Sequence, residues 1–423
     1  MRNTIARLAR HSGARAAIMS KPAKTEVERQ LDALMFGSEF GDEKLAAAMR
    51  AELRERLAEG RPLRVYAGYD PSRPDLHIGH AITLRKLRMF QDFGHDVTFL
   101  VGTFTATVGD ASDRAQGRPR RSAEEVAEAS RSYAEQCYRI LDPAKTRVVY
   151  NADWLSKLPL AEFVAIASNF TVQQFTAREN FRLRLKDGDP IGLHELFYAL
   201  LQGWDAVHLR ADVQLGATEQ LFNIQAGRKL QEIHGQRPCV ILTYPILVGT
   251  DGKARMSKSA GNIVALADPP EEQYGKVMSV SDETMAQWLP LTTRWPPEQV
   301  KRELDDLRAG RIGAMDLKKR LAAEIVATYH GDAAAQSAAE HFTQVHQRRE
   351  LPDEMPEVRI TPGEKVIDVL VRAGAASSKS AARRLVQGSG VRFERETVAG
   401  IDAELSKSGV LQVGKRHFFR VVV

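Results

Sequence analysis

Cysteine and long apolar runs are both scarce in this chain of 423 residues. Only Cys137 and Cys239 are present, about a hundred positions apart. Neither a disulfide framework nor a Cys-x-x-Cys zinc or redox site can therefore form, which points to a reducing compartment, and we expect a cytoplasmic protein. No run approaches the roughly 18 consecutive apolar residues of a membrane-spanning helix, so we expect no membrane partner.

Acidic residues are absent from the first 25 positions, which hold six arginines and lysines. We expect this basic tail, residues 1–25, to be disordered. An arginine-rich start without acids is typical of a mitochondrial transit peptide, and it equally fits an untranslated stretch before a true start at Met19. The sequence alone leaves both interpretations open.

The remaining charge is unevenly distributed. Residues 357–423 hold twelve basic and seven acidic residues, whereas residues 26–356 carry a net charge of −5. A basic end beside a mildly acidic body indicates an appended module for a polyanion. On charge alone, an ordinary solvated surface explains the pattern equally well.

Composition and periodicity define the fold class. Hydrophobic residues make up 43% and charged residues 27% of the chain, which is typical of a globular protein, and domains of roughly 100–200 residues suggest two or three of them. Short β-branched runs at 64–69, 97–101, 147–150, 212–215 and 240–244 alternate with helical patterns, one of them at 77–93 and ended by Gly94. This alternation predicts an α/β protein with a doubly wound parallel sheet.

The domain limits follow from changes of pattern along the chain. We predict a Rossmann-like domain over residues 26–265 with an inserted helical segment at about 120–200, which includes a helix capped by Ser122 that buries Cys137. A charged helical pattern over 266–350 predicts an α-helical domain. Two prolines among acids at 350–356 predict a linker, and residues 357–423 a small α+β domain.

A histidine pair follows the first predicted strand, in His77-Ile78-Gly79-His80. The imidazoles are three residues apart in the first turn of a helix that Asp75 can cap, where free backbone N–H groups and the helix dipole favour an anion. Gly79 leaves room for a ligand against the backbone. The pattern predicts a phosphate site, whereas zinc is a weaker interpretation, because the third ligand and the glutamate of a His-Glu-x-x-His site are absent.

A second basic element lies about 175 residues later and reads Lys253-Ala-Arg-Met-Ser-Lys-Ser259; we call residues 253–259 the basic loop. Three cations and two hydroxyls between glycines suit the binding of a polyphosphate. Taken alone, the segment also fits a solvated loop. The phosphate loop Gly-x-x-x-x-Gly-Lys-Ser/Thr is absent.

Together the two elements resemble the signature motifs of class I aminoacyl-tRNA synthetases, known as HIGH and KMSKS. Both occur in the family's order, with one departure: Arg255 replaces the first lysine. The segments 66–72, 109–110 and 198–205 further resemble the substrate pocket of tyrosyl-tRNA synthetases. The resemblance extends from about residue 27 to the end.

The resemblance implies a role for each matching residue. Tyr66 and Asp205 would bind the substrate phenol, which favours tyrosine over tryptophan, while Asp110, Tyr198 and Gln202 would hold its ammonium group. Tyr198, Gln202 and Asp205 are predicted to lie on one face of one helix. Without the other motifs, we would interpret this helix as one that simply buries an aromatic and two polar groups. The other tyrosine-binding positions would be Gly68, Asp70, Thr105 and Gln220. The ATP-binding positions would be Gly68, Ser72, His77, Gly79, His80, Thr83, Glu219, Met256 and Lys258, and the catalytic positions His77, His80, Lys253, Arg255, Lys258 and Ser259. Gln214 also matches, and Glu219 replaces a common aspartate.

The C-terminal segment resembles the S-four-type RNA-binding module, through 365–374, 378–386 and Gly390-Val391. Ser378 can cap a helix that presents Lys379 and Arg383 on one side and Leu385 towards the core. A domain that merely packs on the body remains the alternative.

The resemblance as a whole implies a tyrosine–tRNA ligase. Such an enzyme uses ATP and Mg²⁺, forms tyrosyl-adenylate, transfers tyrosine to tRNA(Tyr) and acts as a homodimer. Lys379, Arg383 and Arg384 would contact the RNA backbone, and no resident metal site is expected. Two other classes stay open: a different nucleotidyltransferase with the same histidine motif, and a synthetase-like RNA chaperone without catalysis.

Overall fold

The computed structural model describes residues 23–71, 76–110, 123–257, 260–347, 355–394, 396–414 and 417–423. The chain forms two compact units, divided after Asp332. Among the sequence-based predictions, the tail up to residue 22 and the side chains of Ser72, Asp75, Ser122, Lys258 and Ser259 lie outside the described residues. Lys24 and Thr25, expected in the tail, instead belong to helix α1 (Lys24–Met35).

The first unit is built on a five-stranded parallel sheet in the order β3-β2-β1-β4-β5, which confirms the predicted fold class. The strands are β1 (Arg64–Tyr69), β2 (Asp96–Val101), β3 (Thr146–Tyr150), β4 (Val213–Ala217) and β5 (Val240–Tyr244). All five coincide within two residues with the predicted β-branched runs. Because the order reverses between β1 and β4, the loops after these strands diverge and leave a crevice at their carboxyl ends.

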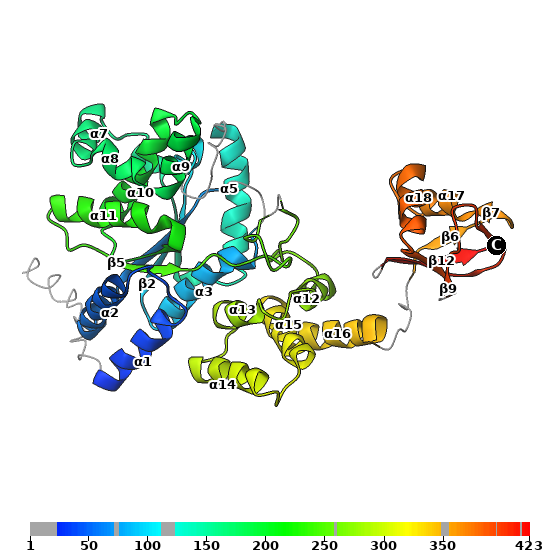
Figure 1. Ribbon diagram of the computed structural model, residues 1–423. Helices are drawn as coiled ribbons and strands as arrows, with labels where there is room; N and C mark the ends of the chain where they lie inside the picture. The colour runs from blue at the N-terminus through cyan, green and yellow to red at the C-terminus, as the bar shows by residue number, and fades with distance from the viewer. Residues whose placement is uncertain are drawn as a thin grey trace, which may run out of the picture. The chain divides into compact units, whose positions relative to one another are not determined.

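Helices cover both faces of this sheet (Figure 1). Helices α3 (Ile78–Asp92) and α5 (Ala123–Cys137) lie on one side, and α10 (Leu193–Leu209) and α11 (Leu221–Ile233) on the other. Gly94 follows α3 with a φ of +87°, as expected of a residue that ends a helix. Cys137 is fully buried, which confirms its predicted place in the core.

Helices occupy most of the predicted inserted segment, at about 120–200, and the stretch after the sheet. The predicted segment follows α4 (Thr105–Val108) and contains α5, strand β3, the short helices α6 (Ala152–Leu155), α7 (Leu160–Ala167), α8 (Val172–Thr176) and α9 (Glu179–Asp187), and the start of α10. After β5 come α12 (Pro270–Met278), α13 (Met285–Thr292), α14 (Pro297–Arg308) and α15 (Ala314–His330). These four belong to the same compact unit as the sheet, and a separate helical domain from residue 266 stays a prediction.

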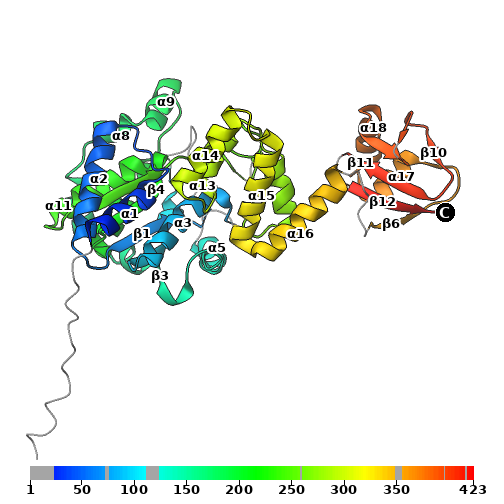
Figure 2. The same cartoon turned by 90° about the horizontal axis from the view of Figure 1, so that it is seen from below.

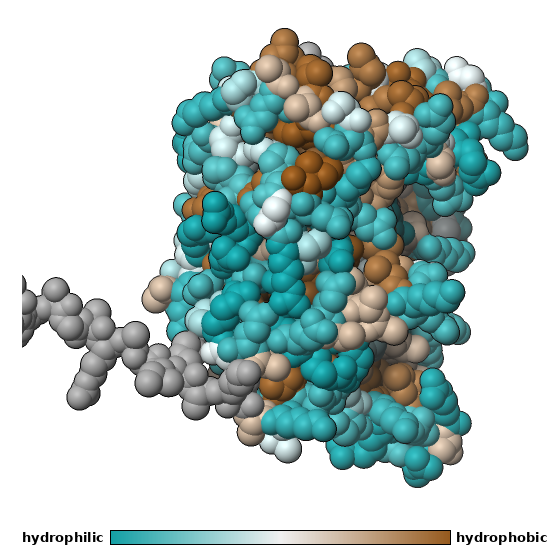
Figure 3. All heavy atoms as spheres, turned by 90° about the vertical axis from the view of Figure 1, so that its left-hand side faces the viewer, coloured by the Kyte–Doolittle hydropathy of each residue, from teal (hydrophilic) through white to brown (hydrophobic). Residues whose placement is uncertain are grey.

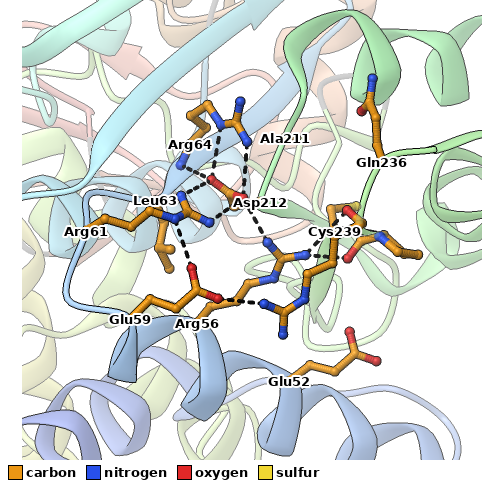
Figure 4. A network of polar contacts seen from close by, with 12 residues as sticks. Glu52, Arg56, Glu59, Arg61, Leu63, Arg64, Ala211, Asp212, Gln236 and Cys239 are labelled. Carbon is orange, nitrogen blue, oxygen red and sulfur yellow. Dashed lines mark hydrogen bonds and ion pairs between the residues drawn. The ribbon is translucent and has the colours of Figure 1, made fainter. Parts of the chain in front are cut away.

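The amino ends of β1 and β4 are held by a buried carboxylate, Asp212 (Figure 4). It accepts hydrogen bonds from Arg56 of α2 (Glu43–Ala58) at 2.8 Å, from Arg61 at 2.8 Å and from Arg64 at 3.1 Å. Burial raises the pKa of Asp212, but the bonds from Arg61 and Arg64 outweigh it and hold that pKa well below its usual value. The aspartate therefore stays ionised and joins a helix, a loop and a strand.

The second unit contains helix α16 (Asp332–Phe342), except for its first residue, and a small α+β module. Its sheet has the order β6-β12-β11-β8-β9, with a separate ladder of β7 and β10. The strands are β6 (Glu357–Arg359), β7 (Glu364–Lys365), β8 (Val391–Phe393), β9 (Glu396–Thr397), β10 (Glu404–Leu405), β11 (Gly409–Val413) and β12 (His417–Val422). Helices α17 (Val366–Arg372) and α18 (Lys379–Gln387) lie beside the strands (Figure 2). Their apolar side chains belong to one core with Leu370 and Leu411.

Candidate active site

A cavity of about 260 Å³ lies at the carboxyl ends of β1 and β4, where the strand order reverses. Parallel sheets bind their ligands at such switch points. Most predicted site residues line this one cavity: Tyr66, Gly68, Asp70, Gly79, His80, Thr83, Thr105, Asp110, Tyr198, Gln202, Asp205, Glu219 and Gln220. Gln214 lines it as well. The structure thus brings together residues that are up to 154 positions apart in the sequence.

The histidine pair forms the start of α3. His77 is the N-cap, which corrects the prediction that Asp75 caps this helix. The Nδ1 of His77 accepts a hydrogen bond from the N–H of Gly79 at 3.2 Å, and the Nδ1 of His80 accepts one from the N–H of His77 at 3.3 Å. In a neutral imidazole whose Nδ1 accepts, the proton is on Nε2. Both rings therefore present an Nε2–H donor at a helix N-terminus, which suits an anion.

Gly79 keeps the space beside these rings open. A Cβ at this position would stand 2.9 Å from the ring of His77, so any side chain would displace the imidazole. Gly79 and His80 line the cavity, whereas His77 stands next to its wall, with its ring tilted by 45° to that of His80 and the two ring centroids 3.9 Å apart. The α3 N-terminus is held against the chain after the basic loop by a bond from Ile78 N–H to the carbonyl of Val264.

One end of the cavity is apolar and holds an acid and a phenol. Tyr66 is 2% exposed, and its hydroxyl has no hydrogen-bond partner among the described residues. Asp205, also 2% exposed, accepts hydrogen bonds from Trp154 Nε1 at 2.8 Å and Asn151 Nδ2 at 3.2 Å. Burial raises the pKa of Asp205 to about 8, against these two bonds, which lower it. A buried hydroxyl without a partner costs ~1–3 kcal/mol, which a ligand hydroxyl would offset.

The opposite side of the cavity carries a network of polar groups. Asp70 accepts hydrogen bonds from Thr105 Oγ1 at 2.7 Å and from the hydroxyl of Tyr198 at 3.0 Å. Gln220 donates to Asp110 at 2.5 Å. These two carboxylates face a cavity that a cationic group could enter.

Sequence reasoning missed three residues that hold this network. Asn151 donates to Thr105 at 3.0 Å as well as to Asp205, and so connects the two ends of the pocket. Asn223 donates to Gln202 and Gln220, and Trp154 bonds Asp205. All three lie on elements outside the recognised motifs. The only sequence signal for Asn151 and Trp154 was their position just after a predicted strand, at the edge where parallel sheets bind ligands. Asn223 lies in α11 and gave no such signal.

The described part of the basic loop stands beside the cavity. Arg255 reaches Glu219 on the cavity wall, with 3.6 Å between guanidinium and carboxylate. Met256 is buried, and Lys253 is exposed. Arg255, Met256 and Lys253 are not among the residues lining the cavity, so the structure places the loop at its margin.

The predicted RNA-binding cations lie in the second unit, on the exposed side of α18. Ser378 accepts a hydrogen bond from the N–H of Ala381, which confirms the predicted cap. Lys379, Arg383 and Arg384 are exposed, and Lys379 pairs with Asp368 of α17 at 2.6 Å. Lys379 and Arg383, four residues apart, therefore share one face of the helix.

Two features are absent from the part of the chain that the structure describes. No group of three or more histidine, cysteine, aspartate or glutamate side chains in it is arranged to hold a metal ion. None of its helices is long and apolar enough to cross a membrane.

Comparison with known proteins places the chain in a class. The family model described as tRNA synthetases class I (W and Y) matches residues 58–347. Among solved structures, a C-terminally truncated mitochondrial tyrosyl-tRNA synthetase from Aspergillus nidulans superposes with a TM-score of 0.59 at 21% identity over 75% of this chain and 93% of that one. The tyrosyl-tRNA synthetase of Archaeoglobus fulgidus, complexed with L-tyrosine, gives 0.58 at 21% identity over 74% and 99%. At 21% identity, these structural similarities establish the fold of the chain and nothing further.

Curated relatives narrow the class further. The tyrosine–tRNA ligase of Thermotoga maritima is 46% identical over 88% of this chain and 93% of its own length. That of Carboxydothermus hydrogenoformans is 41% identical over 94% and 98%. The chain belongs to the tyrosine–tRNA ligase family.

Proposed function

We propose that this protein is an ATP-dependent tyrosine–tRNA ligase. It would join tyrosine to ATP as tyrosyl-adenylate, with release of pyrophosphate, and then transfer the tyrosyl group to the 3′-terminal adenosine of tRNA(Tyr). Family membership supports the reaction. The observation that supports tyrosine as the substrate is the buried end of the cavity, where the Tyr66 hydroxyl lacks a partner and Asp205 presents a carboxylate. Phenylalanine has no hydroxyl, so it would leave the Tyr66 hydroxyl without a partner and would place an apolar ring edge against the buried Asp205 carboxyl.

Tyrosine would lie along the cavity from this end to the polar side. Its phenol would meet Tyr66 and Asp205, and its ammonium group would meet Asp110, Tyr198 and Gln202, with Asp70 close by. Gly68, Thr105 and Gln220 complete the contact surface. Asn151, which bonds both ends of the pocket, would hold their separation constant.

The nucleotide would occupy the side of α3. The Nε2–H groups of His77 and His80 would donate to its phosphates, and Glu219 would accept from its ribose. Gly68, Ser72, Gly79, Thr83 and Met256 would form the rest of this surface. The carboxylate of tyrosine attacks the α-phosphorus as the bond to pyrophosphate breaks, and Lys253, Arg255, Lys258 and Ser259 would stabilise the leaving charge. Catalysis then needs no protein nucleophile, because positioning and charge stabilisation suffice.

Magnesium would enter as part of the ATP substrate. This expectation follows from the chemistry of Mg²⁺, which commonly binds through substrate phosphates. We propose a cytoplasmic location, which the two free, buried cysteines support.

Pyrophosphate–ATP exchange tests this function directly. We expect exchange that depends on tyrosine and is nearly absent with phenylalanine or tryptophan, with magnesium and without tRNA. Exchange with tryptophan would keep the reaction and overturn the pocket assignment. Folded protein that exchanges with no amino acid would overturn the ligase function and favour a binding role.

We further propose a homodimer that forms through the inserted helices. Leu160 is 78% and Leu193 68% exposed, and Val164 and Val172 nearby are exposed as well. Leu160 and Val164 are four residues apart on α7 and share a face. Helix α7 lies at the upper left of Figure 1, and Figure 3, which views the molecule from that side, shows several apolar side chains at the top of this face. Exposed patches of this kind mark interaction surfaces.

Val164→Asp is expected to convert the dimer into a monomer, because a charge at the centre of an apolar contact loses its water on association. Light scattering after size exclusion measures the mass. Met315→Asp, at a methionine of α15 that is 51% exposed against 59% for Val164, should leave the dimer intact. A Val164→Asp protein that keeps twice the chain mass contradicts this surface.

The second unit would bind the RNA backbone through α18. We expect Arg383→Ala/Arg384→Ala to weaken tRNA binding and to reduce the slope of log affinity against log salt by about one for each phosphate that the protein no longer neutralises. Adenylate formation should be unchanged, since both side chains lie in the other compact unit. Arg372→Ala, which removes an arginine paired with Glu364, is the control. Equal effects of the two changes on affinity would refute the assignment.

A further inference from the structure

The chain around Lys253 and Arg255 is organised by one buried amide, that of Asn262, which is 3% exposed. Its Nδ2 donates to a carboxylate oxygen of Asp251 at 3.0 Å and to the carbonyl of Arg255 at 3.1 Å. Its Oδ1 accepts from the N–H of Ser257 at 2.8 Å. The side chain therefore bonds the chain before and after Lys253.

The surrounding backbone is shaped for this amide. A Cβ at Gly249 would stand 2.2 Å from the Nδ2 of Asn262, so only glycine leaves the amide in place. Gly252 has a φ of +68° and turns the chain, and the other oxygen of Asp251 accepts from the N–H of Lys253 at 3.0 Å. The N–H of Thr250 donates to the carbonyl of Asn262 at 3.0 Å. Five hydrogen bonds thus define one conformation.

This conformation determines where Arg255 points. The carbonyl of Arg255 is bound by Asn262, and its guanidinium stands 3.6 Å from Glu219 on the cavity wall. Both positions depart from the motif of the family, which usually has lysine and often aspartate there. Arg255 and Glu219, the two residues that differ from the family's usual motif, therefore form an ion pair with each other.

We propose that Asn262 is a positioning residue for adenylate formation, which orients the main chain so that Arg255 meets the nucleotide side of the pocket at Glu219. The inference rests on the proposed function. Only an amide fits, because the site requires a donor to Asp251 and to a carbonyl together with an acceptor for an N–H. Aspartate would accept from Ser257 but would place a second negative charge beside Asp251.

The test is a cycle of isosteric exchanges. Asn262→Asp is expected to lower kcat of tyrosine-dependent pyrophosphate exchange on the order of 10- to 100-fold, as expected when a displacement misplaces catalytic groups. KM for tyrosine should stay unchanged, because Tyr66 and Asp205 lie on other elements. The double exchange Asp251→Asn/Asn262→Asp removes the like-charge pair but leaves the carbonyl of Arg255 without its donor, so we expect kcat to stay low while the melting temperature partly recovers.

Thermal unfolding of each variant separates positioning from folding. A purely structural role predicts that kcat and melting temperature fall together in Asn262→Asp and recover together in the double exchange, which would overturn the inference. Wild-type kcat in Asn262→Asp would overturn it as well. Wild-type protein without tyrosine-dependent exchange would instead contradict the proposed function, so the two failures are distinguishable.

Discussion

Asp205→Asn is expected to lower kcat/KM for tyrosine on the order of 100-fold, the effect of losing a charged, buried hydrogen-bond partner. Asparagine keeps the volume, but its amide N–H₂ cannot accept from Trp154 and Asn151, which both donate to Asp205. The asparagine must therefore turn its oxygen to them and its donors to the substrate. Pyrophosphate exchange with tyrosine and with phenylalanine measures the effect, and the ratio of the two rates should fall.

Matched variants locate this effect at the phenol end. Tyr66→Phe removes only the hydroxyl that has no partner, so exchange with tyrosine should fall and exchange with phenylalanine should not. Asp153→Asn changes an exposed acid next to Trp154 and should leave both rates unchanged. A tyrosine-to-phenylalanine ratio that is unaltered in Asp205→Asn would contradict the assignment.

The raised pKa of Asp205 adds a dependence on pH. Burial brings the pKa of this carboxyl to about 8 in the unliganded protein, so it is mostly protonated at pH 6. A phenol that donates to the carboxylate favours the ionised form, so binding releases a proton below pH 8. Affinity for tyrosine should therefore rise from pH 6 to pH 8, as measured by calorimetry, and Asp205→Asn should abolish this rise.

The largest expected effect on stability belongs to Asp212→Asn. The change leaves Arg56, which is 1% exposed, without a carboxylate at the amino end of β4, and removes the acceptor shared by Arg61 and Arg64 (Figure 4). Breaking a buried ion pair by removing one partner costs ~3–5 kcal/mol. We expect a loss of this size in the free energy of unfolding, measured with denaturant.

The exposed end of the same network provides the control. Glu59→Gln removes a partner of Arg61 and Arg237 at the surface, where such pairs contribute ~0–1 kcal/mol. The folded protein lowers the pKa of Asp212 below its usual 3.8, so its stabilisation is complete above that pH and is lost as the pH falls through the lower value. If Asp212→Asn costs no more than Glu59→Gln, the buried network is not what holds α2 to the sheet.

Much of the fold and of the candidate site could be predicted from local patterns in the sequence. Alternation of β-branched runs and helices predicted five parallel strands, because burial on both faces of a sheet imposes that pattern on the sequence itself. The histidine motif and Tyr198–Asp205 segment were recognisable because their residues are neighbours on one helix. The N-cap could not be chosen from sequence, because Asp75 and His77 both precede the same helix and only the backbone conformation decides between them.

Contacts between distant residues needed the tertiary structure. Three of the residues that hold the site belong to no recognised motif: Asn151, Trp154 and Asn262. Their roles become visible only in the tertiary structure, where the first two bond Asp205 and the third bonds the carbonyl of Arg255. A polar side chain after a strand looks the same in sequence whether it faces solvent or a buried carboxylate.

The sequence by itself determined the fold class, the order of the phosphate-binding elements and the resemblance to tyrosyl-tRNA synthetases, since each depends on residues close together in the chain. The tertiary structure decided which groups share one cavity and which carboxylates are buried. It alone brought Arg255 to Glu219, and Arg56, Arg61 and Arg64 to Asp212. The reason is physical: hydrogen bonding and desolvation act through space, and the topology of the sheet determines which residues meet.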